Sequence, residues 1–73
     1  MLTYRIQMCG NEWILRHPDY TLPVIQHADK EYLITLLPDH FKKRKEKAFV
    51  DVLDDWGRFE RRLELPTTQT SPL

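Results

Sequence analysis

The sequence predicts a small α+β domain in which two β-hairpins flank one helical segment, in the order strand-strand-helix-strand-strand. Three observations predict this fold class. Residues 3–17 and 49–65 each alternate between apolar and polar types around a glycine-containing turn, which is the period of half-buried strands. Between them, apolar residues recur at helical spacing. We therefore expect a small antiparallel sheet with the helical segment packed on one face.

The chain is 73 residues long, with 41% hydrophobic and 30% charged residues, which is typical of one folded soluble domain. We expect this domain to cover residues 1–66 and the polar stretch 67–73 to be a flexible tail. The 11 basic and 11 acidic residues balance, which argues against a bulk nucleic-acid binder, because such proteins rely on excess positive charge.

The only cysteine is Cys9, so no disulfide forms within the chain. Small secreted domains are more often cross-linked by disulfides. No apolar run has signal-peptide or membrane-spanning length. We expect a cytoplasmic protein that does not enter a membrane.

The first hairpin comprises Thr3–Met8 and Glu12–His17, joined by Gly10-Asn11. This dipeptide suits the positive φ angles of a two-residue turn. The turn pairs Cys9 with Glu12, Met8 with Trp13, and Ile6 with Leu15, so that the large apolar partners share one face. Trp13 is therefore expected in the core.

Residues 17–20 break this strand, because Pro18 lacks a donor and Asp19 favours turns. Thr21–Gln26 is a candidate for a short extended segment. Pro23 would confine it to a sheet edge or keep it out of the ladder.

A helix is expected to start after Asp29, a good N-cap residue. Its apolar stripe comprises Leu33, Leu36, Leu37 and Phe41. Pro38 leaves two interpretations open. Either one kinked helix runs from about Asp29 to Lys45, or two short helices exist and Pro38 opens the second.

The second hairpin comprises Phe49–Leu53 and Arg58–Leu65, with a three-residue loop and Gly57 in the left-handed conformation. The expected register places Asp51 opposite Arg61 and Leu53 opposite Phe59. A shift of one residue would place Asp51 opposite Glu60, and like charges directly opposite each other destabilise a sheet.

Nine residues are candidates for partner binding, and each has a purely structural alternative. The basic run either contacts phosphate or an acidic protein surface, or is a solvated helix end that complements the helix dipole. Trp56 either anchors a partner or folds back onto the sheet. The hairpin arginines either extend the binding face or form a solvated face with neighbouring glutamates. The candidates are Lys42, Lys43, Arg44, Lys45, Lys47, Trp56, Arg58, Arg61 and Arg62.

Catalytic and metal-binding patterns are not recognisable. His17, His27 and His40 form no close pair with each other or with Cys9, although zinc sites usually contain such pairs. There is no nucleophile elbow or phosphate-cradling glycine loop, and Asp54-Asp55 fits turn chemistry. We expect no enzyme activity, no cofactor and no metal.

In length and element order, the chain resembles the small regulators that lytic bacteriophages, such as Xanthomonas phages, make to bind host RNA polymerase. The resemblance implies a cytoplasmic protein, in the host bacterium if phage-encoded, that inhibits transcription initiation or causes antitermination. The layout is also similar to uncharacterised short bacterial domains, in which Asp55-Trp56-Gly57-Arg58 would occupy an Asp-x-Gly-Arg turn.

The leading hypothesis is a monomeric, non-enzymatic regulator that binds bacterial RNA polymerase. A small nucleic-acid-binding module that uses residues 42–47 is the alternative, and an accessory domain of unassigned activity is a further one.

Overall fold

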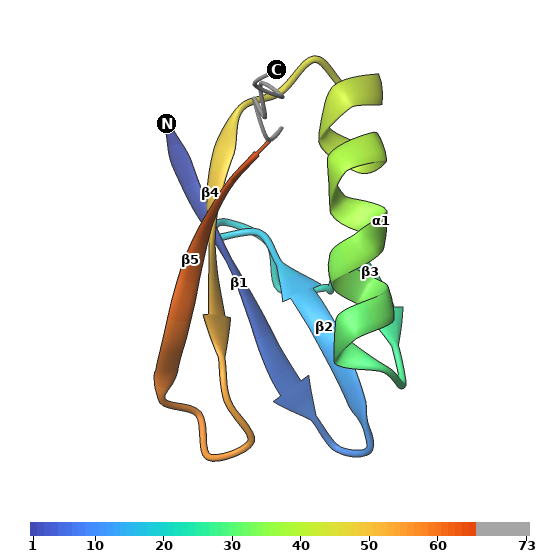
Figure 1. Cartoon of the computed structure of the whole chain (residues 1–73), viewed down its shortest axis with the longest axis vertical. Coiled ribbons are helices and arrows are strands. Elements are labelled where there is room, and N and C mark those ends of the chain that lie inside the picture. The colour runs from blue at the N-terminus through green and yellow to red at the C-terminus, as the bar shows by residue number, and fades with distance from the viewer. Residues whose placement is uncertain (66–73) are drawn as a thin grey trace, which may run out of the picture.

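A five-stranded sheet with one helix across one face forms the fold (Figure 1). The computed structural model describes residues 1–65. Along the sheet the strand order is β3-β2-β1-β4-β5. The elements are β1 (Leu2–Cys9), β2 (Glu12–Arg16), β3 (Ile25–His27), α1 (Lys30–Lys43), β4 (Ala48–Leu53) and β5 (Phe59–Leu65).

The α+β class and the order of hairpin, helix and hairpin are confirmed, but the sheet is mixed rather than purely antiparallel. The central strands β1 and β4 are parallel, from Leu2 beside Ala48 to Ile6 beside Val52. The physical reason is the helical crossover. Helix α1 carries the chain back along the sheet, so that β4 starts at the same end as β1 and runs in the same direction (Figure 1).

The first hairpin has the predicted register, with Ile6 opposite Leu15, Met8 opposite Trp13 and Cys9 opposite Glu12. Gly10 adopts a φ of 66° in the turn, which a residue without Cβ tolerates best. Trp13 is in the core, as expected, with 6% of its surface exposed.

The edge next to β2 is formed by the very short strand β3. It pairs antiparallel with β2 and places Ile25 opposite Leu15. The expected extended segment started earlier, at Thr21, whereas the ladder includes only Ile25–His27. Pro23 lies before the strand, in agreement with the expectation that proline would be kept out of the ladder.

Helix α1 is one continuous helix that contains Pro38, so the two-helix interpretation is wrong. Asp29 caps it as predicted, because its carboxylate oxygen accepts the backbone N–H of Glu31 at 3.0 Å. The helix ends at Lys43, two residues before the expected limit. Three residues of its stripe are fully buried, namely Leu33, Leu37 and Phe41.

The second hairpin has a bulge that changes the predicted register. Leu53 lies opposite Phe59 as expected, but Asp51 lies opposite Arg62 and not Arg61. The ladder is irregular between Val52 and Leu53, where β5 has one extra residue. The predicted charge complementarity is still present, because Arg62 Nε lies 2.7 Å from Asp51 Oδ1.

The core lies between α1 and the inner face of the sheet. All of its members come from that face or from the helix stripe, and Ile6, Leu15, Val50 and Val52 are among the most deeply buried. The tail expected over residues 67–73 and the domain boundary at residue 66 lie outside the described residues.

Candidate functional site

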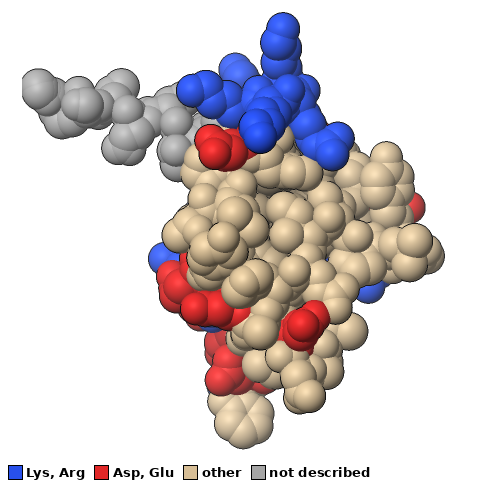
Figure 2. All heavy atoms as spheres, turned by 90° about the vertical axis from the view of Figure 1, so that its right-hand side faces the viewer, with Lys and Arg blue, Asp and Glu red and all other residues tan. Residues whose placement is uncertain are grey.

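The C-terminal end of α1 gathers the basic run into one surface, here called the basic end, which consists of Lys42, Lys43, Arg44, Lys45 and Lys47. All five side chains are exposed. Figure 2 shows lysine and arginine side chains concentrated at this end of the molecule, while most of the acidic side chains in this view lie lower. A protein of zero net charge therefore has a strongly cationic end.

A Schellman motif directs the chain out of the helix at the basic end. The N–H of Glu46 donates to the carbonyl of Phe41 at 3.0 Å, and the N–H of Lys45 donates to that of Lys42 at 3.1 Å. Lys45 adopts a φ of 53°, a left-handed conformation in which glycine is usual. This turn spreads the last cations around the helix end, where the last carbonyls favour positive charge.

The cations of the basic end are not neutralised within the described residues. Among residues 1–65, none of the five lies within 4.0 Å of a carboxylate, whereas Lys30, Arg61 and Arg62 all form ion pairs. Glu46, the one carboxylate in the run, instead accepts the hydroxyl of Tyr4, with 2.7 Å from Tyr4 Oη to Glu46 Oε2. Within residues 1–65, these cations thus remain available to an external anionic group.

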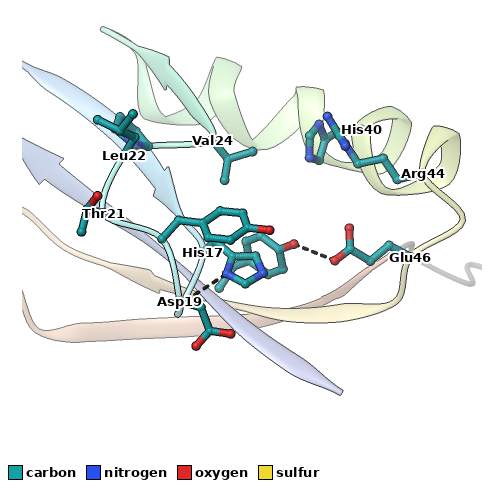
Figure 3. Close-up of a pocket in the computed structure, with 11 residues that line it drawn as sticks. His17, Asp19, Thr21, Leu22, Val24, His40, Arg44 and Glu46 are labelled. Carbon is teal, nitrogen blue, oxygen red and sulfur yellow. Dashed lines mark hydrogen bonds between the residues drawn. The ribbon is translucent and has the colours of Figure 1, made fainter.

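A pocket of about 600 Å³ adjoins the basic end (Figure 3). Arg44 and Glu46 reach it from the end of the helix, and the loop between β2 and β3 forms its opposite wall. Its lining combines aromatic, apolar and charged side chains and comprises Tyr4, His17, Asp19, Tyr20, Thr21, Leu22, Pro23, Val24, His40, Arg44 and Glu46.

The aromatic wall of the pocket is built on His17, which directly follows β2 and is 9% exposed. Its ring stacks on Tyr20, with 4.0 Å between centroids, and meets Tyr4 edge-on at 5.0 Å. The backbone N–H of Asp19 donates to His17 Nδ1 at 3.0 Å. In the neutral imidazole, the proton is therefore on Nε2.

Two groups of the pocket have shifted pKa values. Burial, followed by the nearby Arg44 charge, lowers the pKa of His40, so this imidazole is neutral at physiological pH. Burial and the hydrogen bond to Glu46 raise the pKa of Tyr4. Tyr4 thus remains a neutral donor, and the fixed positive charge of the pocket comes from Arg44.

The tip of the β4–β5 hairpin presents Trp56 at the opposite end of the molecule from the basic end. Trp56 is 80% exposed, so it does not fold back onto the sheet. The carboxylate of Asp54 accepts the backbone N–H groups of Trp56 and Arg58, both at 2.9 Å, and Gly57 has the predicted positive φ of 80°. Strand β4 separates this tip from the basic end, a span of roughly 20 Å for six residues.

The remaining candidates do not join the basic end. Arg61 lies 3.6 Å from Glu31 of α1 and 3.5 Å from Glu60, whereas Arg62 binds Asp51. Arg62 also lies over the ring of Phe49, at 4.9 Å from its centroid. The nine candidates therefore fall into separate groups, in which the five cations of the basic run share one surface and Trp56 and Arg58 lie together at the hairpin tip.

The pocket residues outside the basic run were not among the sequence candidates. Their grouping depends on tertiary packing, which brings the start of β1, the end of β2 and the end of α1 together. One signal was present in the sequence. The inward alternation of Trp13 and Leu15 continues to His17, which marks that histidine as an inward-facing residue.

Residues 1–65 contain neither a metal-binding cluster nor a membrane-spanning helix. In this part of the chain, no three His, Cys, Asp or Glu side chains are grouped so that they could hold a metal ion. The single described helix, α1, is neither long nor apolar enough to cross a membrane.

Comparisons with protein-family models, curated proteins and solved structures found no match to this chain.

Proposed function

We propose that this protein is a non-enzymatic, protein-binding regulator that docks through the basic end and its adjoining pocket. The observation that carries the proposal is the cluster of five exposed cations without carboxylate partners in the described residues, next to a pocket lined by Tyr20, Leu22 and Val24. Protein interfaces often combine a pocket that takes one apolar or aromatic anchor with a polar rim.

The partner chemistry that fits is an acidic protein surface with a protruding apolar side chain. Lys and Arg at the rim attract carboxylates over long range and raise the association rate. The resemblance to phage regulators leads us to propose bacterial RNA polymerase as the partner, with inhibition of initiation or antitermination as the result.

A nucleic-acid-binding module that combines the basic run with Trp56 is less well supported. The two features lie at opposite ends of β4, so the same nucleotides cannot be stacked on Trp56 and held by the lysines. Nucleic acid therefore enters the proposal only as a competing outcome of the experiment.

The test is binding of the full chain to purified bacterial RNA polymerase, measured by biolayer interferometry at low and physiological salt. Neutralising all five cations to Gln is expected to weaken binding tenfold or more, mainly through slower association. Leu22→Ala, at a rim residue with 76% exposure, is expected to speed dissociation.

Trp56→Ala is the matched control, because it removes an equally exposed apolar side chain at the other end of the molecule. It should leave both rates unchanged. Absence of polymerase binding at low salt, or equal losses for Leu22→Ala and Trp56→Ala, would contradict the proposal. Steeply salt-dependent binding to DNA or RNA without polymerase binding would favour the nucleic-acid alternative.

A further inference from the structure

Two arginines lie side by side on the sheet face that α1 does not cover. Arg5 of β1 and Arg16 of β2 are directly opposite in the antiparallel register. The residues on either side of Arg5, Tyr4 and Ile6, belong to the core beneath α1, so Arg5 and its cross-strand partner point to the other face. Directly opposite residues have Cβ atoms about 4.5–5.5 Å apart.

The carboxylate nearest to this pair in the sheet is already engaged. Asp51 lies beside Arg5 in the parallel β1–β4 register, but both of its oxygens accept from Arg62, at 2.7 and 3.2 Å. Within residues 1–65, neither Arg5 nor Arg16 lies within 4.0 Å of a carboxylate. Within these residues the two guanidinium groups therefore have no ion pair at contact distance, and only Arg5 is close enough for its charge to act on Asp51.

Such an arrangement is unfavourable unless an anion compensates it, because like charges opposite each other destabilise an antiparallel pair. Elsewhere in the same sheet, an arginine lies opposite a carboxylate, because Asp51 of β4 faces Arg62 of β5. An anion bound between Arg5 and Arg16 would remove this repulsion.

A cleft of about 250 Å³ at this position is lined by Thr3, Arg5, Arg16, His17 and Pro18. Both arginines line it, and the planar fork of a guanidinium group suits bidentate binding of phosphate oxygens. The Thr3 hydroxyl adds a further donor. The volume is below the range of pockets for drug-sized ligands, so it fits one small charged group.

We propose that Thr3, Arg5 and Arg16 form a binding site for a phosphate group, either inorganic phosphate or a phosphate monoester. Two guanidinium charges match the charge of about −1.5 to −2 that a monoester carries at pH 7. The site lies on the sheet face opposite α1 and shares no cation with the basic end, so it stands independently of the proposed docking function.

The first test is an NMR titration of the full chain with inorganic phosphate and, separately, with phosphoserine, at constant ionic strength. Both are expected to cause saturable shifts at Thr3, Arg5 and Arg16. Arg5→Gln should weaken binding roughly tenfold, the effect expected from losing a charge-assisted hydrogen bond. Arg58→Gln removes an equal charge at the exposed hairpin tip and should change nothing.

The second test uses Arg16→Glu, which places an opposite charge beside Arg5 and is expected to fold with a higher Tm in phosphate-free buffer. Phosphate should raise the Tm of the natural protein, because it binds the folded state, but not that of the variant. Tighter binding of phosphoserine assigns the site to an ester, and tighter binding of inorganic phosphate to the free ion.

Three results would overturn the proposal. They are the absence of a saturable response, equal losses for Arg5→Gln and Arg58→Gln, and equal stabilisation of the natural protein and Arg16→Glu by phosphate. Binding of a single-stranded oligonucleotide without binding of phosphate or phosphoserine would overturn it as well.

Discussion

The basic end and the hairpin tip of this molecule differ in how their charges are paired and in whether their aromatic rings are buried. At the basic end, five cations have no carboxylate within 4.0 Å among the described residues, and the neighbouring aromatic ring of Phe41 is fully buried. At the hairpin tip, the carboxylate of Asp54 organises the turn through two backbone hydrogen bonds, while the aromatic ring of Trp56 is exposed.

This difference shows that the two ends are stabilised in different ways. The basic end is stabilised by the aromatic packing beneath it. Its surface cations have no carboxylate partners among the described residues, and the stability of this end does not depend on them. The tip is held by its own local hydrogen bonds, so its tryptophan is free for contact but contributes little to folding. Four predictions test this contrast.

The largest effect is expected for Phe41→Ala. Phe41 is fully buried and meets Tyr4 edge-on, with 5.0 Å between ring centroids. Removing such a ring destabilises by about 3–5 kcal/mol, a large fraction of the stability of a small domain. Trp56→Ala, the matched change at the tip, should alter the free energy of unfolding by less than about 0.5 kcal/mol. Urea denaturation measures the free energy of unfolding of both variants. Comparable losses would contradict the difference between the buried ring at the basic end and the exposed ring at the tip.

Tyr4→Phe is expected to lower stability by about 1 kcal/mol, because it removes the hydroxyl that Glu46 accepts. The pKa of Tyr4 is raised in the folded state, so the unfolded chain ionises first as pH rises. The natural protein should therefore lose stability above about pH 10, and Tyr4→Phe should show a smaller loss there. Urea titrations between pH 8 and 11 provide the measurement.

Tyr32→Phe is the control for this change, because Tyr32 is 50% exposed on the helix surface. It should leave both the stability at neutral pH and the slope above pH 10 unchanged. An identical slope for Tyr4→Phe and the natural protein would show that Tyr4 is not the group responsible.

Lys45→Gly is expected to stabilise the fold by about 0.5–1 kcal/mol, because Lys45 has a φ of 53° and glycine adopts this conformation without strain. Lys43→Gly removes the same charge inside the helix and should destabilise by about 0.5–1 kcal/mol. Urea midpoints compare the two variants. A stabilising effect of both would assign the gain to lost charge repulsion at the basic end instead of to the backbone.

The smallest effect is expected for Asp54→Asn at the tip. Hydrogen bonds from the backbone of Arg58 and Trp56 lower the pKa of Asp54. Its contribution to stability is therefore present above about pH 4 and is lost as pH falls through the lowered pKa. Asparagine keeps an acceptor oxygen, so the variant should be as stable as the natural protein at pH 7. Its loss of stability on acidification should be less steep. Asp55→Asn is the control and should lose stability on acidification as steeply as the natural protein. Thermal unfolding from pH 7 to 2.5 measures these losses.

The sequence predicted the first hairpin more completely than the second, because the prediction relied on local turn chemistry. Gly10-Asn11 specified a two-residue turn, and with it every pair of the first ladder that was predicted. The second hairpin has a bulge, and a bulge adds a residue without a clear local signature. Charge complementarity pointed to an arginine opposite Asp51, but it did not distinguish Arg61 from Arg62.

Residue types and their spacing by themselves determined the α+β class, the N-cap at Asp29, the helix stripe, the first register and the location of the basic run. These features depend on neighbours within a few residues, which the sequence displays directly. Tertiary structure alone decided the parallel pairing of β1 with β4, the pocket around His17 and the placement of Arg5 opposite Arg16, with no ion pair to either arginine within residues 1–65. These depend on contacts between residues far apart in the chain, and such contacts form only once the crossover helix has brought both hairpins into one sheet.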